Sequence, residues 1–130
     1  MKFLLLLTLT VFSGVESYAA KAVSDTVPYS AQSMAGDFST AALQMGVNDR
    51  TSFQAVWTES TPSLSGTLKI QVSSDCSNWD DLSGMSVDLT DGSGSQLFIL
   101  NAVSFKCLRF NFVSTGGDCA LTVNQRAVNQ

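Results

Sequence analysis

One stretch of nine residues, SSDCSNWDD at positions 73–81, gathers most of the side chains in this chain that could do chemistry. Its carboxylates and its amide carry oxygen atoms of the kind that Ca²⁺ binds. A calcium site would use Asp75, Asn78, Asp80 and Asp81 as ligands. The spacing lacks the EF-hand register and its closing glutamate. We therefore expect no metal site here and keep calcium as a minor alternative.

Two other interpretations of this stretch centre on Trp79. In the first, Trp79 stands exposed as a platform for a sugar ring, while Asn78 and Asp80 hydrogen-bond to sugar hydroxyls. In the second, the stretch is a corner between two strands. Asp75 and Asn78 then bond backbone amides of the turn, and Trp79 folds back over the edge of the core. The corner is favoured, because Asp, Asn and Ser are the residues that turns select.

Arg109 is a further candidate for ligand binding. The alternation of its segment points it outward beside Asn111, where it would contact a carboxylate or a sugar. The alternative, which we favour, pairs Arg109 with an acid on a neighbouring strand, such as Asp88.

A catalytic role is disfavoured by what the chain contains. Glu59 and Asp118 are carboxylates at predicted strand ends, but a glycosidase needs a cleft that holds its two carboxylates at a fixed separation. Short loops on a small domain do not build one. The chain also has no histidine, the commonest general base and zinc ligand. We expect no enzyme, no catalytic residue and no cofactor, and we keep a small carbohydrate-active hydrolase only as a second alternative.

Charge and the N-terminal segment restrict the class of protein further. The 130 residues contain 7 Lys and Arg against 11 Asp and Glu, a net charge of −4, which disfavours nucleic acid and anionic lipid as partners. The segment MKFLLLLTLTVFSGVESYAA is typical of a secretory signal peptide, with cleavage after Ala19. Its apolar run is too short to span a bilayer, so no membrane insertion is expected. We predict a secreted, periplasmic or cell-surface protein.

Three cysteines remain in the exported chain, which suggests one disulfide and one free thiol. If TGGD at 115–118 (Thr115 to Asp118) closes a hairpin that sets Phe112 opposite Leu121, then Cys107 and Cys119 lie too far apart to bond. Cys76 and Cys119 both follow strand ends. We therefore predict a Cys76–Cys119 disulfide with Cys107 free, either covered on a sheet face or bonded to another subunit.

Period-two alternation predicts strands throughout the rest of the chain. The inward faces contain residues 53, 55 and 57, then 68, 70 and 72, then 108, 110 and 112. The segment 96–103 is apolar throughout, which predicts a strand buried on both sides or one that runs into a bend. No segment shows a capped helical stripe. We predict an all-β antiparallel sandwich of the jelly-roll type over residues 37–130, after an arm or edge strand at 20–36.

The segments TSFQAVWTESTPSLSGTLKIQVSSDCSNWDDL and FKCLRFNFVSTGGDCALTV resemble a small β-sandwich module of phage virion and tail proteins and of bacterial fibre or adhesin proteins. The matching residues are Trp57, Gly66, Thr67, Leu68, Ile70, Gln71, Ser74, Asp75, Asn78, Trp79 and Arg109. The resemblance implies a galactose-binding or discoidin-like jelly roll. Cys76 departs from the pattern, since a glycine is usual at that position.

Such modules serve both as ligand binders and as building blocks. Our leading hypothesis is a non-catalytic recognition or adhesion module that binds a surface glycan or a protein. It would use loops at one end of the sandwich, at 59–66, 75–81, 91–95 and 115–118. The alternative is a structural subunit that assembles into a homo-oligomer or fibre through the arm at 20–36 or through Cys107.

Overall fold

The alternating segments form strands whose apolar sides meet in the middle of the molecule. Phe53, Ala55 and Trp57 are buried on one strand, and Phe110 and Phe112 on another, while the residues that alternate with them face away from the core. The computed structural model describes residues 23–46, 50–90, 92–101 and 103–128. The predicted signal peptide, 1–19, lies outside the described residues.

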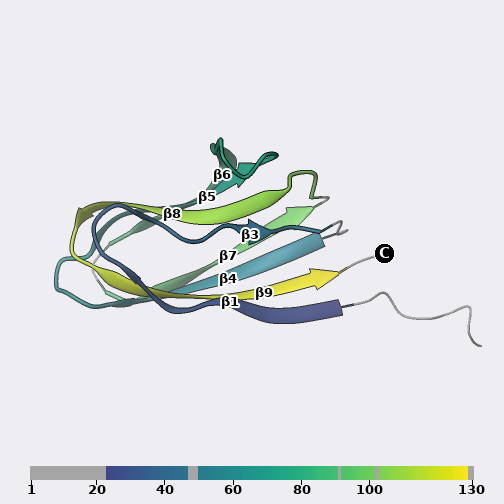
Figure 1. Ribbon diagram of the computed structural model, residues 1–130. Helices are drawn as coiled ribbons and strands as arrows, with labels where there is room; N and C mark the ends of the chain where they lie inside the picture. Colours follow the sequence, from purple (N-terminus) through teal and green to yellow (C-terminus); the bar gives the residue numbers. More distant parts are fainter. Residues whose placement is uncertain (1–22, 47–49, 91, 102, 129–130) are drawn as a thin grey trace, which may run out of the picture.

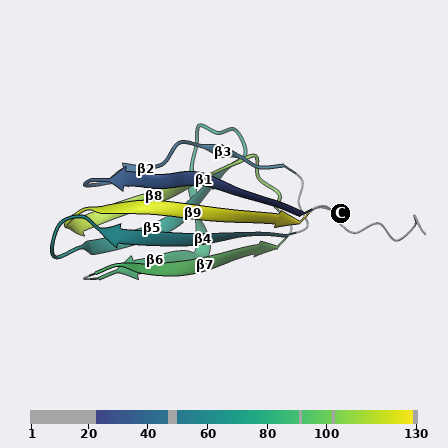
Figure 2. The ribbon, with the colours of Figure 1, turned by 90° about the horizontal axis from the view of Figure 1, so that it is seen from below.

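Two antiparallel sheets pack face to face (Figures 1 and 2). One has the order β1-β9-β4-β7, and the other has the order β2-β8-β5-β6, with β3 also paired to β8. The strands of the described residues are β1 (Val23–Met34), β2 (Phe38–Ser39), β3 (Leu43–Gln44), β4 (Arg50–Glu59), β5 (Ser65–Ser73), β6 (Asp80–Leu89), β7 (Gly94–Asn101), β8 (Cys107–Gly116) and β9 (Cys119–Val128). The predicted all-β antiparallel sandwich is confirmed.

Aromatic rings join the two sheets at the centre of the core. The ring of Phe110, on β8, lies 5.8 Å from that of Phe53, 6.0 Å from that of Phe98 and 6.2 Å from that of Tyr29, between ring centroids. The contacts to Phe53 and Tyr29 are edge-to-face, the geometry that aromatic pairs prefer. All three partners belong to the four-stranded sheet, so Phe110 fixes one layer against the other.

The predicted hairpin between β8 and β9 is wrong. Phe112 pairs with Leu68 in the five-stranded sheet, whereas Leu121 pairs with Trp57 in the four-stranded sheet. The chain therefore changes layers between these strands, at the bend on the left of Figure 1. Gly117 allows this bend: its φ is +69°, and a Cβ there would lie 2.8 Å from the Cα of Leu64.

The loops divide between two ends of the sandwich, which corrects the prediction that they gather at one. Ser65 pairs with Gly116, and Trp57 pairs with Gly94, so loops 59–66 and 115–118 and the described part of loop 91–95 share one end. Ser73 pairs with Cys107 at the other end, where the 75–81 loop lies. The 75–81 loop lies at this other end because β5 and β8 are antiparallel, which places the loop after β5 beside the start of β8.

The predicted arm at 20–36 contains strand β1 in its described part. This strand pairs with β9 from Val23 to Met34 and forms one edge of the four-stranded sheet. Among the described residues, no helix is long and apolar enough to cross a membrane.

Candidate functional site

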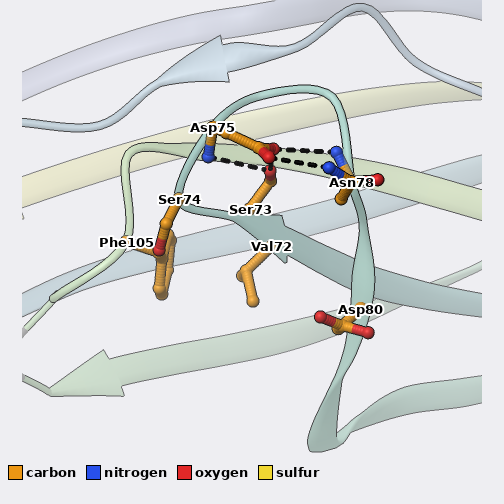
Figure 3. Close-up of a pocket in the computed structure, with 7 residues that line it drawn as sticks. All are labelled: Val72, Ser73, Ser74, Asp75, Asn78, Asp80 and Phe105. Atoms are coloured by element: carbon orange, nitrogen blue, oxygen red, sulfur yellow. Dashed lines mark hydrogen bonds between the residues drawn. The ribbon is translucent and has the colours of Figure 1, made fainter.

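The 74–79 loop is shaped by the carboxylate of Asp75. Its Oδ1 atom accepts hydrogen bonds from the backbone amides of Ser77 and Asn78, at 2.9 and 2.8 Å, and from the hydroxyl of Ser73 at 2.9 Å. Its Oδ2 atom accepts from the side-chain amide of Asn78 at 2.7 Å (Figure 3). Asp75 therefore closes the turn, as the corner interpretation predicted, while Asn78 bonds to Asp75 with both its backbone and its side chain.

These bonds explain the ionisation of Asp75. The backbone amide of Asn78, then its side chain, then the amide of Ser77 and the hydroxyl of Ser73 hold the pKa of Asp75 far below its ordinary value. The carboxylate is therefore charged at any physiological pH, and its oxygens are occupied by the loop itself.

A disulfide between Cys76 and Cys107 anchors the loop, with Cα atoms 5.4 Å apart. The predicted Cys76–Cys119 pair with Cys107 free is wrong: Cys119 is the free cysteine, and it is buried. That prediction required β5 and β8 to end at the same edge of the sandwich. Since they are antiparallel, Cys76 after β5 meets Cys107 at the start of β8, whereas Cys119 follows the far end of β8.

Trp79 lies on the outer face of the five-stranded sheet, partly exposed. The guanidinium of Arg109 lies 4.4 Å from the centre of its ring. Trp79 is not among the described residues that form the core or pack against it. Trp79 therefore does not pack over the core edge as the corner interpretation expected; it is half-buried, and the Arg109 guanidinium lies over its ring.

A row of polar side chains continues from Arg109 across three strands. The Arg109 Nε donates to the Gln71 side-chain oxygen at 2.8 Å, and the Gln71 amide donates to Asp81 at 2.9 Å. Lys69 donates to the other oxygen of Asp81 at 2.9 Å. We call Arg109, Gln71, Asp81 and Lys69 the polar row. The bond from Gln71, then that from Lys69, lowers the pKa of Asp81.

One prediction about this face is wrong, and one minor alternative finds no support in the geometry. Arg109 does not pair with Asp88, which accepts a hydrogen bond from Thr67 instead. The four proposed calcium ligands also do not converge: Asp75 serves the turn, and Asp81 belongs to the polar row. In the described part of the chain, no group of three or more His, Cys, Asp or Glu side chains is placed to hold a metal ion.

An open pocket of about 340 Å³ lies beside the anchored loop. Figure 3 shows Phe105 and Ser74 on one side of Val72 and Asp80 on the other. The pocket is lined by Val72, Ser73, Ser74, Asp75, Asn78, Asp80 and Phe105. It therefore combines one aromatic ring with hydroxyl, amide and carboxylate groups, a lining suited to a ligand with hydroxyls and a small apolar face.

Some of the residues at this corner could be named from the sequence, and others could not. Asn78, Trp79, Asp80 and Arg109, the four ligand-binding candidates, all lie at this corner. Phe105 was not proposed for the site, because it belongs to the segment before β8 and reaches the loop only through the β5–β8 pairing. Gln71 was predicted to face outward, but its position between Arg109 and Asp81 depends on which strands flank β5.

The carboxylates considered for hydrolysis lie at the opposite end of the molecule, where they support loops. Glu59 accepts a hydrogen bond from the amide of Gly92, and Asp118 accepts one from the amide of Gly36. Each carboxylate therefore holds a loop through a backbone amide.

The chain matches no family model. It also matches none of the curated proteins. Among solved structures, it is similar to the SPBc2 prophage-derived protein YomS, with a TM-score of 0.55 and 13% identity over 85% of this chain and 96% of that one. It is also similar to the PBSX exported protein XepA, with a TM-score of 0.53 and 15% identity over 82% of this chain. The chain spans 37% of XepA.

A third similar structure is a CBM4 carbohydrate-binding module, with a TM-score of 0.43 and 15% identity over 72% of this chain and 61% of that one. At identities this low, structural likeness shows the fold alone. The two structures with TM-scores above 0.5 establish that this chain has a β-sandwich fold that also occurs in phage-derived proteins.

Proposed function

We propose that the protein is a secreted, non-catalytic recognition module that binds a surface saccharide at the disulfide-anchored corner formed by Trp79, Arg109 and the adjoining pocket. The observation that carries the proposal is the position of Trp79. It is a large aromatic side chain outside the core, partly exposed and held by a cation. Exposed, rigid aromatic rings with polar neighbours are typical of ligand-binding surfaces.

The corner offers the two kinds of contact that a sugar needs. The ring of Trp79, or that of Phe105 in the pocket, presents an apolar face for the C–H groups of a pyranose. Asn78, Asp80 and Ser74 present polar groups for its hydroxyls. Asp80 is the free carboxylate of the set, since Asp75 is occupied by the turn.

Preorganisation also supports recognition. The Cys76–Cys107 disulfide and the bonds to Asp75 fix the loop before any ligand arrives, which reduces the entropy lost on binding. The fold is compatible with this role, because the similar structures include an exported, phage-derived protein. Secretion is further supported by the disulfide, which forms in oxidising compartments.

The test is a glycan array with the mature protein, followed by titration of any saccharide found. The variant is Trp79→Ala. Val113→Ala serves as the matched control, since Val113 is exposed on the same sheet away from the corner. We expect Trp79→Ala to weaken binding about tenfold, the equivalent of about 1.4 kcal/mol, with the control unchanged. No saccharide bound by the folded protein, or equal binding by Trp79→Ala, would refute the proposal.

A further inference from the structure

The open edges of the two sheets differ in how they are protected. A strand at a sheet edge exposes unpaired backbone groups, which another strand can pair with. Proteins block such edges with proline, charged side chains, bulges or short strands. In the described part of the chain, the edges are β1 and β7 in one sheet, and β6, β2 and β3 in the other.

Every edge except β7 carries such protection. Strand β1 contains Pro28 and Asp25 and has two register irregularities against β9. Strand β6 carries Asp80, Asp81 and Asp88 and has a register shift against β5. Strands β2 and β3 are two residues long.

Strand β7 has none of these features. Its sequence, GSQLFILN, contains no charge and no proline, and it pairs with β4 over eight consecutive residues without a bulge. Leu97 is 47% exposed and Ile99 is 46% exposed on its outer face. Of the two alternatives expected for this apolar segment, a strand buried on both sides is thus wrong. Figure 2 shows β7 at the lower rim of the four-stranded sheet, with β4 on one side only.

We propose that β7 is the interface of a homodimer, in which the β7 strands of two copies pair antiparallel and join the four-stranded sheets into one. A two-fold axis perpendicular to the sheet keeps the outer faces of both copies on the same side. Odd-numbered residues of one copy, which point to the outer face, then lie opposite odd-numbered residues of the other copy. The register with Phe98 opposite Phe98 sets Leu97 opposite Ile99 of the second copy. The exposed side chains thus cover each other in two equivalent pairs.

The distribution of charge favours a second copy at this edge over a copy at any other. The protein has a net charge of −4, and antiparallel self-pairing of β6 would bring Asp81 of one copy close to Asp88 of the other. Among the described residues, charged side chains at the β7 edge lie only near its two ends. Glu59 bonds to Gly92 before the strand, and Arg50 bonds to Asn101 at its last residue. Antiparallel pairing brings the Arg50 end of one copy toward the Glu59 end of the other.

An apolar groove beside the strand adds to the surface that a second copy would cover. It opens between β6 and β7 and includes Leu82, Met85, Val103 and Phe105 in its lining. One eight-residue strand and this groove form an interface near the lower end of the specific range, about 1,200 Å² in total. We therefore expect a dimer that dissociates on dilution.

The experiment is sedimentation velocity of the mature protein over a concentration series, with two lysine variants. Ile99→Lys places a charge on the β7 edge at an already exposed position and is expected to leave a monomer at all concentrations. Val27→Lys changes a residue that is 53% exposed on the β1 edge and should leave the dimer unchanged. Circular dichroism checks that both variants are folded.

Three results would overturn the proposal. They are a wild-type protein that is monomeric throughout the series, a dimer that survives Ile99→Lys, and a dimer lost in Val27→Lys. A larger assembly that Val27→Lys disrupts would place the contact at β1 instead. Amide hydrogen exchange gives an independent readout: protection of the β7 amides should rise with protein concentration in the wild type and not in Ile99→Lys.

Discussion

The disulfide between Cys76 and Cys107 is expected to stabilise both the fold and the binding loop, and its removal tests both. The two cysteines are 31 residues apart in sequence. In the chain-entropy model, opening a loop of this length costs about 3.7 kcal/mol of folding free energy at 25 °C. For a domain of roughly 110 residues, that loss lowers the Tm by about 15 °C.

The assay is guanidinium and thermal unfolding of the Cys76→Ser/Cys107→Ala double variant. Position 107 is changed to alanine and not to serine because Cys107 is fully buried, and a serine hydroxyl there would be a buried polar group. Reduced wild-type protein should show a similar loss, since it lacks the same bond. Cys119→Ala is the matched control: it removes a buried thiol that forms no disulfide, so only a small packing loss of about 1 kcal/mol is expected.

The loop should respond more strongly than the core. Without the disulfide, the 74–79 loop keeps its bonds to Asp75 and the contact of Trp79 with Arg109 but loses its covalent connection to β8, so Trp79 should become more exposed to acrylamide quenching. A stability loss below about 1 kcal/mol in the double variant would contradict the chain-entropy argument. Peptide mapping that joins Cys76 to Cys119 would contradict the structure on which that argument depends.

Two further predictions concern the core and the pH response. Phe110→Ala should lower the free energy of unfolding by about 3–5 kcal/mol, because the ring contacts aromatic residues of the opposite sheet. Phe110→Leu keeps part of the apolar volume and should lose less of that free energy. Chemical denaturation of both variants measures the two losses. Asp75 has a depressed pKa in the folded state, so its stabilising effect is present above its unfolded pKa of about 3.9 and is lost progressively as the pH falls from that value toward the lower folded pKa. The free energy of unfolding, measured by urea denaturation, should therefore decrease below about pH 4 in the wild type, and Asp75→Asn should reduce that decrease. An unaltered decrease in Asp75→Asn would assign the pH response to another group.

The alternation of residues in the sequence was sufficient to predict the fold class. Inward positions such as Phe53, Leu68 and Phe112 are fully buried, because a side-chain period of two permits one apolar face for each strand. The local chemistry of the turn at Asp75 could also be predicted, since its bonds reach only residues two and three positions away. The candidates Asn78, Trp79, Asp80 and Arg109 lie together at one corner of the fold, and whether they bind a ligand stays a prediction.

Only the tertiary structure decided how the strands are distributed between the two sheets. Alternation is the same whether Phe112 pairs with Leu121 or with Leu68, so the sequence could not show that the chain changes layers at Gly117. That one choice determined the disulfide partner of Cys76 and the contact between Arg109 and Trp79. The pairing of β7 with β4 alone, which the sequence also could not show, placed β7 at an edge of its sheet, with Leu97 and Ile99 on the outer face. Strand order depends on contacts between residues far apart in the chain, whereas the patterns in a sequence report on neighbours.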